Sequence, residues 1–118
     1  MDTVPYGLIP PAIVSRAVPL ASEGVEDVAW CREDALEVIR LARDAQFAIL
    51  GGDVWMRQGK RWVPTYDTWA CDRDQEESLE AFSARSCDKA SAYVAEYPER
   101  KRGSLVYVLV FADRSGVR

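Results

Sequence analysis

The feature that most constrains the fold is the last apolar run, Ser104 to Phe111, because both of its alternating sets of side chains are apolar. Successive side chains of a strand point to opposite faces of a sheet. One set is Leu105, Tyr107, Leu109 and Phe111, and the other is Val106, Val108 and Val110. A strand with two apolar faces needs a layer packed against each of them. We therefore predict that this run is a central strand.

Two helices are predicted from the helical spacing of apolar side chains. The first covers about residues 32–45, and its inward-facing side chains are Ala35, Val38, Ile39 and Ala42. Charged residues occupy its opposite face, which is typical of a half-buried surface helix. The second helix covers about residues 75–97 and ends before Pro98. Asp74 and Glu77 have the spacing of a capping box, so we expect Asp74 to cap this helix.

The region between the predicted helices has the pattern of a hairpin. Residues 47–50 are predicted to form a short buried strand that resumes at 54–57, followed by a turn at 58–60 and a strand at 61–66. Gly51 and Gly52 interrupt the first strand, which indicates a bulge or a close backbone approach. Pro64 lacks a backbone N–H, so the second strand should be an edge strand or end irregularly.

Four of the six prolines lie in the first twenty residues, so we expect an irregular, extended N-terminal segment over residues 1–30. Within it, Ala12–Val14 is predicted to add a short edge strand. The whole chain of 118 residues is expected to be one domain, 1–118. The order of elements predicts the α+β class: a small, mostly antiparallel sheet of about three or four strands with two helices packed on it.

Composition excludes several kinds of chemistry. The chain has no histidine, which rules out Ser-His-Asp and Cys-His catalysis and histidine metal ligands. Its three cysteines, Cys31, Cys71 and Cys87, form no CxxC pair and are expected to be reduced thiols. We expect neither a metal nor a cofactor. The N-terminus lacks a signal-peptide pattern and no apolar run is long enough to cross a bilayer, so we expect a cytoplasmic protein with no membrane partner.

The most unusual segment runs from Tyr66 to Asp74 and combines acidic with large aromatic side chains. It is expected to connect a strand to a helix. Two more tryptophans, Trp55 and Trp62, lie on the neighbouring hairpin. Exposed tyrosine and tryptophan favour protein interfaces, because each buries a large area at low entropic cost. The alternative is that these rings cover a small core.

The charge distribution favours a basic partner over a nucleic acid. The net charge is −4, and six acidic residues against one basic residue occur both in Glu23–Glu37 and in Asp67–Glu80. Acidic runs are usually solvated, but beside exposed aromatic rings they would suit the capture of a basic protein. The only basic run, Arg100-Lys101-Arg102, is interpreted as a solvated turn, so nucleic-acid binding is not expected.

Two other functions remain open from the residues alone. One is a small regulatory or ligand-binding module with a pocket beside Gly51-Gly52. The other is an enzyme that uses Asp53, Asp67, Asp72 or Asp74 as acid–base groups or magnesium ligands. Aspartate is common in turns and caps, and no phosphate-binding glycine loop is present, so catalysis is not the expected function.

Two strings of residues resemble a known family. Ala48-Ile49-Leu50-Gly51-Gly52-Asp53-Val54, and then Pro64-Thr65-Tyr66-Asp67-Thr68-Trp69-Ala70-Cys71-Asp72, are similar to immunity protein family 40 of bacterial polymorphic toxin systems. The resemblance covers roughly residues 31–111. It implies a non-enzymatic antidote that binds a cognate toxin domain in the producing cell. The matching positions Asp53, Asp67, Trp69 and Asp72 are either structural or part of the interface.

These observations lead to one hypothesis for the binding site. Trp55, Tyr66 and Trp69 are predicted to anchor the toxin surface. Asp67 and Asp72 would meet its basic groups, and Asp53 belongs to the same candidate set. The sequence does not define the oligomeric state.

Overall fold

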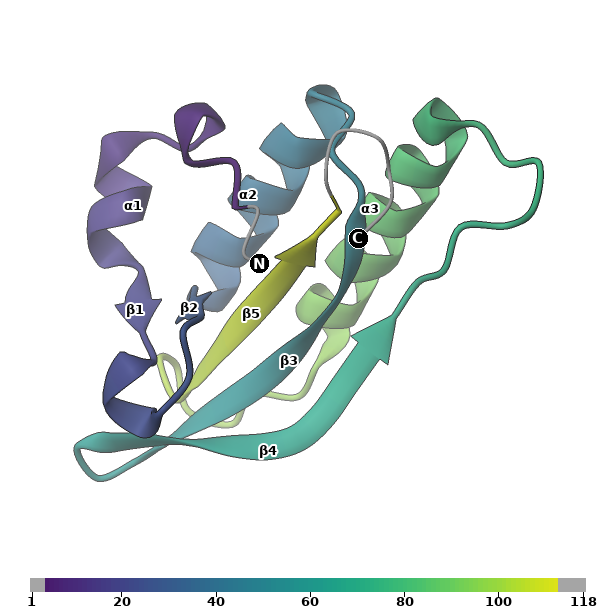
Figure 1. The fold of residues 1–118 in the computed structure, drawn as a ribbon. Coiled ribbons are helices and arrows are strands. Elements are labelled where there is room, and N and C mark those ends of the chain that lie inside the picture. Colours follow the sequence, from purple (N-terminus) through teal and green to yellow (C-terminus); the bar gives the residue numbers. More distant parts are fainter. Residues whose placement is uncertain (1–3, 113–118) are drawn as a thin grey trace.

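The computed structural model describes residues 4–112 and has an α+β fold, as predicted (Figure 1). Its main sheet is antiparallel with strand order β4-β3-β5, formed by Ile49–Gln58 (β3), Arg61–Ala70 (β4) and Leu105–Phe111 (β5). The long helices α2 (Arg32–Asp44) and α3 (Leu79–Glu96) lie side by side on one face of this sheet. The two predicted helices on a small antiparallel sheet are therefore confirmed.

The N-terminal part consists of short elements beside β5. These are η1 (Tyr6–Leu8), α1 (Pro11–Arg16), β1 (Val18–Pro19), η2 (Ala21–Glu23) and β2 (Val28–Ala29), with β1 and β2 paired antiparallel. The edge strand predicted at Ala12–Val14 is wrong, because these residues lie in α1. Proline is tolerated at the first helical position, where its missing N–H would have no partner, so Pro11 starts this helix rather than preventing it.

The predicted position of the last apolar run is also wrong. β3 is the central strand and β5 lies at the edge of the three-stranded sheet. The outer edge of β5 is paired at Tyr107 by Trp30, whose backbone N–H donates to the Tyr107 carbonyl at 2.9 Å and whose carbonyl accepts from the Tyr107 N–H at 2.8 Å. The burial of both faces is confirmed: Tyr107 packs on the helix side, and Val108 packs with Leu20 on the other.

The glycine pair allows a close approach of backbone and ring, as predicted. A Cβ atom on Gly51 would lie 2.2 Å from the Trp69 carbonyl oxygen. On Gly52 it would lie 2.2 Å from the Val108 carbonyl oxygen and 2.3 Å from the Trp69 ring. The pairing of β3 with β5 also shifts between Ile49 and Gly51, which is the predicted bulge. Only glycine fits here, because the neighbours include backbone atoms that cannot rotate away.

Helix α3 begins later than the capping-box pattern predicts. Ser78 is its N-cap, and the Ser78 Oγ accepts a hydrogen bond from the Ala81 N–H at 3.0 Å. Asp74 is therefore not the cap. The predicted pair does interact, since the Asp74 N–H donates to Glu77 Oε1 at 2.9 Å, but this contact closes a turn before the helix. Ser78 caps α3 because serine is among the residues preferred at the N-cap position.

We predict that Gly52→Ala lowers the free energy of unfolding by at least about 2 kcal/mol, because the methyl group would overlap the Val108 carbonyl and the Trp69 ring. Gly7→Ala is the matched control, since its added Cβ meets no atom within 4 Å, and we expect a change within about 0.5 kcal/mol. Urea unfolding monitored by tryptophan fluorescence measures both. Equal stabilities of the two variants would contradict the proposed packing.

Candidate partner-binding site at the bend of β4

The candidate site forms where β4 bends and its pairing with β3 is interrupted (Figure 1). Trp55 pairs with Pro64 and Asp53 pairs with Thr68, so residues 65–67 of β4 lie opposite Val54 alone. The sequence predicts that the segment from Tyr66 to Asp74 connects a strand to a helix. The connection starts after Ala70 instead, because β4 continues through that residue. Extra residues in one strand bend it and redirect side chains, and such bulges are common beside functional sites.

Tyr66 occupies the centre of this bend in a strained conformation. Its φ angle is 70°, in the left-handed region, and 85% of its surface is exposed. Thr65 holds the bend, since its Oγ1 donates to the Val54 carbonyl at 2.9 Å and accepts from the Asp67 N–H at 3.1 Å. A bulky residue rarely adopts a left-handed conformation, and such outliers concentrate at functional sites. The bend thus presents an aromatic ring to solvent at a cost in stability.

Asp67 is fixed by a residue from the far end of α3. Its Oδ2 accepts a hydrogen bond from the Tyr97 hydroxyl at 2.6 Å. Burial and this hydrogen bond both raise the pKa of Tyr97, so the tyrosine stays a donor. The Asp67 side chain itself is exposed. The site therefore carries a carboxylate that is held in one place but remains accessible.

A cavity of about 170 Å³ lies beside the bend and brings together four of the six predicted site residues, Asp53, Trp55, Tyr66 and Asp67. Val54, Pro64 and Thr68 complete its lining. Burial, together with the nearby charge of Asp27, raises the pKa of the Asp53 carboxyl. A half-buried carboxylate in such surroundings is stabilised by a cation that enters the cavity. Neither glycine of the pair Gly51-Gly52 lines this cavity.

The other two predicted residues lie away from the cavity. Trp69 is only 7% exposed and faces the helices, where its ring stacks on Tyr93 with a centroid distance of 4.6 Å. Trp55, which lines the cavity, is also buried, at 8% exposed. Asp72 is exposed in the segment that follows β4. The two tryptophans therefore support the surface from within, and Tyr66 is the aromatic residue that a partner meets directly.

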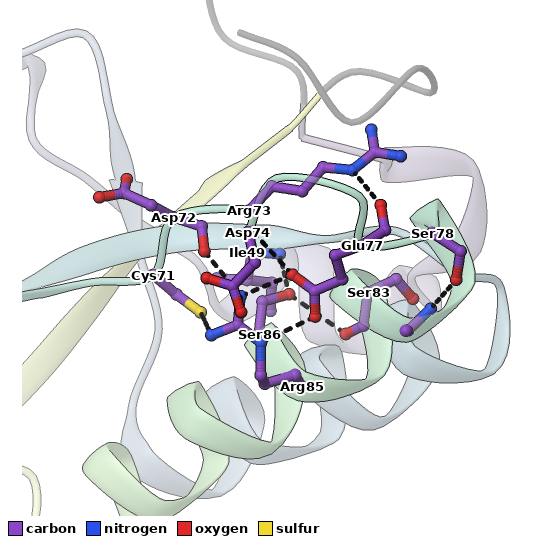
Figure 2. A network of polar contacts seen from close by, with 11 residues as sticks. Ile49, Cys71, Asp72, Arg73, Asp74, Glu77, Ser78, Ser83, Arg85 and Ser86 are labelled. Carbon is purple, nitrogen blue, oxygen red and sulfur yellow. Dashed lines mark hydrogen bonds and ion pairs between the residues drawn. The ribbon is translucent and has the colours of Figure 1, made fainter.

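Arg85 organises the acidic segment between β4 and α3 (Figure 2). Its guanidinium group donates to both carboxylate oxygens of Glu77 at 2.8 Å, to the Asp72 carbonyl at 2.6 Å and to the Cys71 sulfur at 3.3 Å. The hydrogen bonds from Arg85 lower the pKa of Glu77 from 4.5 to about 2, with help from the Asp74 N–H. This network positions the segment that carries Asp72.

Three residues that shape this region are not among those predicted from the sequence: Thr65, Tyr97 and Arg85. Thr65 accepts a hydrogen bond from the backbone N–H of Asp67, and Tyr97 donates one to its carboxylate. Tyr97 is thirty positions away from Asp67 in the chain. Arg85 lies within the second predicted helix, and its position in the sequence does not indicate its contacts with the segment before that helix. Serine and threonine commonly bond to neighbouring backbone, which is the one local signal that favours a role for Thr65.

Several features are absent from the described residues. Residues 4–112 contain no group of three or more acidic or cysteine side chains placed to hold a metal ion. Within the same range, no helix is long and apolar enough to span a bilayer. The three cysteines are free thiols.

The bend of β4 combines an exposed tyrosine with carboxylates, and tyrosine is among the residues enriched at protein interfaces. In a comparison with protein families, the family model for immunity protein 40 matches residues 19–111, most of the chain. The protein therefore belongs to the immunity protein 40 family. No curated protein and no solved structure matches the chain.

We predict that Tyr66→Gly is more stable than Tyr66→Ala by about 1 kcal/mol, because glycine adopts the left-handed conformation without strain and alanine does not. Both variants lose the same exposed ring, so the comparison isolates the backbone. Chemical denaturation of the two variants measures the difference. If alanine were as stable as glycine, the bend would not be strained at this residue.

We predict that Glu77→Gln removes part of the pH dependence of stability. Folding lowers the pKa of Glu77 from 4.5 to about 2, so its carboxylate stabilises the fold above about pH 4.5. This contribution is lost as the pH falls toward about 2, because the folded protein then has to bind the proton. Urea unfolding across this range should show wild type and Glu77→Gln converging at low pH.

The control for this experiment is Glu76→Gln, which removes an exposed carboxylate from the same segment. It measures the effect of removing one exposed carboxylate that forms no ion pair with the part of the chain from 4 to 112. A difference between wild type and Glu77→Gln that stays constant with pH would show that the contact with Arg85 does not stabilise the carboxylate.

Proposed function

We propose that this protein binds and neutralises a cognate toxin domain in the cytoplasm of the producing cell, without catalysis. Membership of the immunity protein 40 family supports the general role. The observation that carries the binding site is Tyr66, an exposed aromatic side chain on a left-handed backbone beside a cavity. The backbone of Tyr66 is strained although its exposed ring gains little packing, and an interaction of the ring with a partner best explains this combination.

Tyr66 would act as the anchor of the interface. Tyrosine and tryptophan dominate binding hot spots because they bury much surface with few rotatable bonds. The backbone of Tyr66 is already held by Thr65, so little conformational freedom is lost on binding. Preorganisation of this kind slows dissociation, which is where most differences in affinity arise.

The partner surface would present a basic side chain to the cavity. Asp53 and Asp67 line it, and Asp67 is held by Tyr97, so a lysine or arginine that enters would form charge-assisted hydrogen bonds. Asp72, Asp74, Glu76 and Glu80 add exposed negative charge along the adjoining segment. Charges at the rim speed the encounter with a basic partner and add less to the affinity itself.

The test is co-expression with the toxic C-terminal domain encoded beside this gene, scored by growth and by co-purification. We expect growth to be rescued and a stable complex to be recovered. Tyr66→Ala should weaken the complex by about 2 kcal/mol, roughly thirtyfold, as expected for a hot-spot residue. Tyr6→Ala is the matched control, because Tyr6 is also exposed, at 45%, but lies on η1.

Each other outcome contradicts a specific part of the proposal. Full affinity of Tyr66→Ala would exclude the bend of β4 as the interface. Rescue without a complex would indicate an enzyme that acts on the toxin or its product, and metal-dependent turnover lost in Asp53→Asn would identify it. No rescue, together with saturable thermal stabilisation by a small molecule, would favour the ligand-binding module.

A further inference from the structure

Two basic segments that are about forty residues apart in the sequence converge at the hairpin end of the sheet. One is the β3–β4 hairpin, with Arg57, Lys60 and Arg61, and the other is the segment before β5, with Arg100, Lys101 and Arg102. The backbone N–H of Arg57 donates to the Ser104 carbonyl at 2.9 Å and joins the two segments. In a chain of net charge −4, this concentration of positive charge is local.

The two segments line an open cleft of about 530 Å³. Its lining contains three cationic side chains and no acidic one; the residues are Arg57, Gly59, Lys101, Arg102, Gly103 and Ser104. None of them lines the cavity beside Tyr66, so this is a separate place on the molecule. The volume lies within the range of small-molecule sites, roughly 300–1,000 Å³.

The cationic groups of the cleft are available to a ligand. Lys101 forms no ion pair with any part of the chain between residues 4 and 112. Arg102 has one partner, Glu33 at 3.7 Å, but both side chains are largely exposed, at 88% and 63%. An ion pair so exposed contributes little and is easily exchanged for a stronger one. The lining is therefore positively charged, and the ion pair between Arg102 and Glu33 is its weak, exposed compensation within the range 4–112.

Arg57 is held in place before any ligand arrives. Its guanidinium carbon lies 5.0 Å from the centre of the Trp62 ring, and the backbone N–H of Trp62 donates to Glu23 Oε2 at 3.3 Å. An arginine stacked on an aromatic ring keeps its N–H donors available at its edge, where they match two oxygens of one phosphate. Gly59 and Gly103 have φ angles of 65° and 81°, and a Cβ on either would meet nothing within 4 Å, so the space beside both turns is open.

We propose that this cleft binds a diphosphate group, either free or carried by a nucleotide. A diphosphate carries several negative charges in a small volume, which matches three cations around one cleft. A nucleic acid fits less well, because it needs a continuous basic face along its backbone and this chain is acidic elsewhere. The site is independent of the toxin-binding surface proposed above.

The test is titration of the full chain with inorganic pyrophosphate and, separately, with ADP, followed by calorimetry and by NMR amide shifts at about 0.15 M salt. We expect saturable binding at one site with shifts confined to residues 57–62 and 100–104. The double variant Lys101→Gln, Arg102→Gln should bind at least tenfold more weakly. The control Arg40→Gln, Arg43→Gln removes the same charge from α2 and should bind as wild type.

The two ligands distinguish the sources of the diphosphate: tighter binding of ADP indicates a nucleotide, and equal binding indicates the diphosphate alone. Arg57→Lys keeps the charge and should still lose several-fold in affinity, because lysine lacks the planar donor pair. The proposal is overturned if pyrophosphate and ADP both fail to bind saturably. It is also overturned if citrate binds equally well, if both charge-removing variants lose affinity equally, or if only a single-stranded oligonucleotide binds.

Discussion

Trp69 can lie between the sheet and α3 only because β3 carries a glycine where the indole ring passes. The ring would come within 2.3 Å of a Cβ on Gly52, and on its other side it stacks on Tyr93. Tyr93 contacts Tyr97, and Tyr97 contacts Tyr107 of β5, with ring centroids 5.8 and 6.1 Å apart. This aromatic column joins both outer strands to α3, and its member Tyr97 also holds Asp67.

The column explains how a site can form on an edge strand. An edge strand has neighbours on one side only, so its backbone is free to bend. Trp69 fixes β4 after the bend, and pairing of Trp55 with Pro64 fixes it before the bend. The strained conformation of Tyr66 is thus maintained by packing on both sides, and its ring remains exposed. Packing in the core therefore offsets the strain at Tyr66, the residue that the bend exposes.

Features that depend on local periodicity were predictable from the sequence. The helical spacing of the apolar residues that include Val38 and Ile39 predicts α2. The adjacent glycines predict the close approach in β3. Features that depend on distant partners were not. Trp30 pairs with Tyr107 of β5 from 77 positions away, and the apolar pattern of the last run does not distinguish such an edge strand from a central one. For the same reason, the residues predicted for the candidate site do not all lie together. The alternation of side chains along β4, together with its bulge, turns Trp69 toward the core and Tyr66 toward solvent. No local sequence pattern predicts this bulge.

The central claim is that the partner contacts the bend of β4. Hydrogen exchange of the backbone amides, compared between the free protein and its complex with the toxin domain, tests this most directly. The account predicts that added protection is concentrated in residues 63–72, with little change on the outer face of α2. Protection on α2 or in the N-terminal elements, with residues 63–72 unchanged, would contradict it.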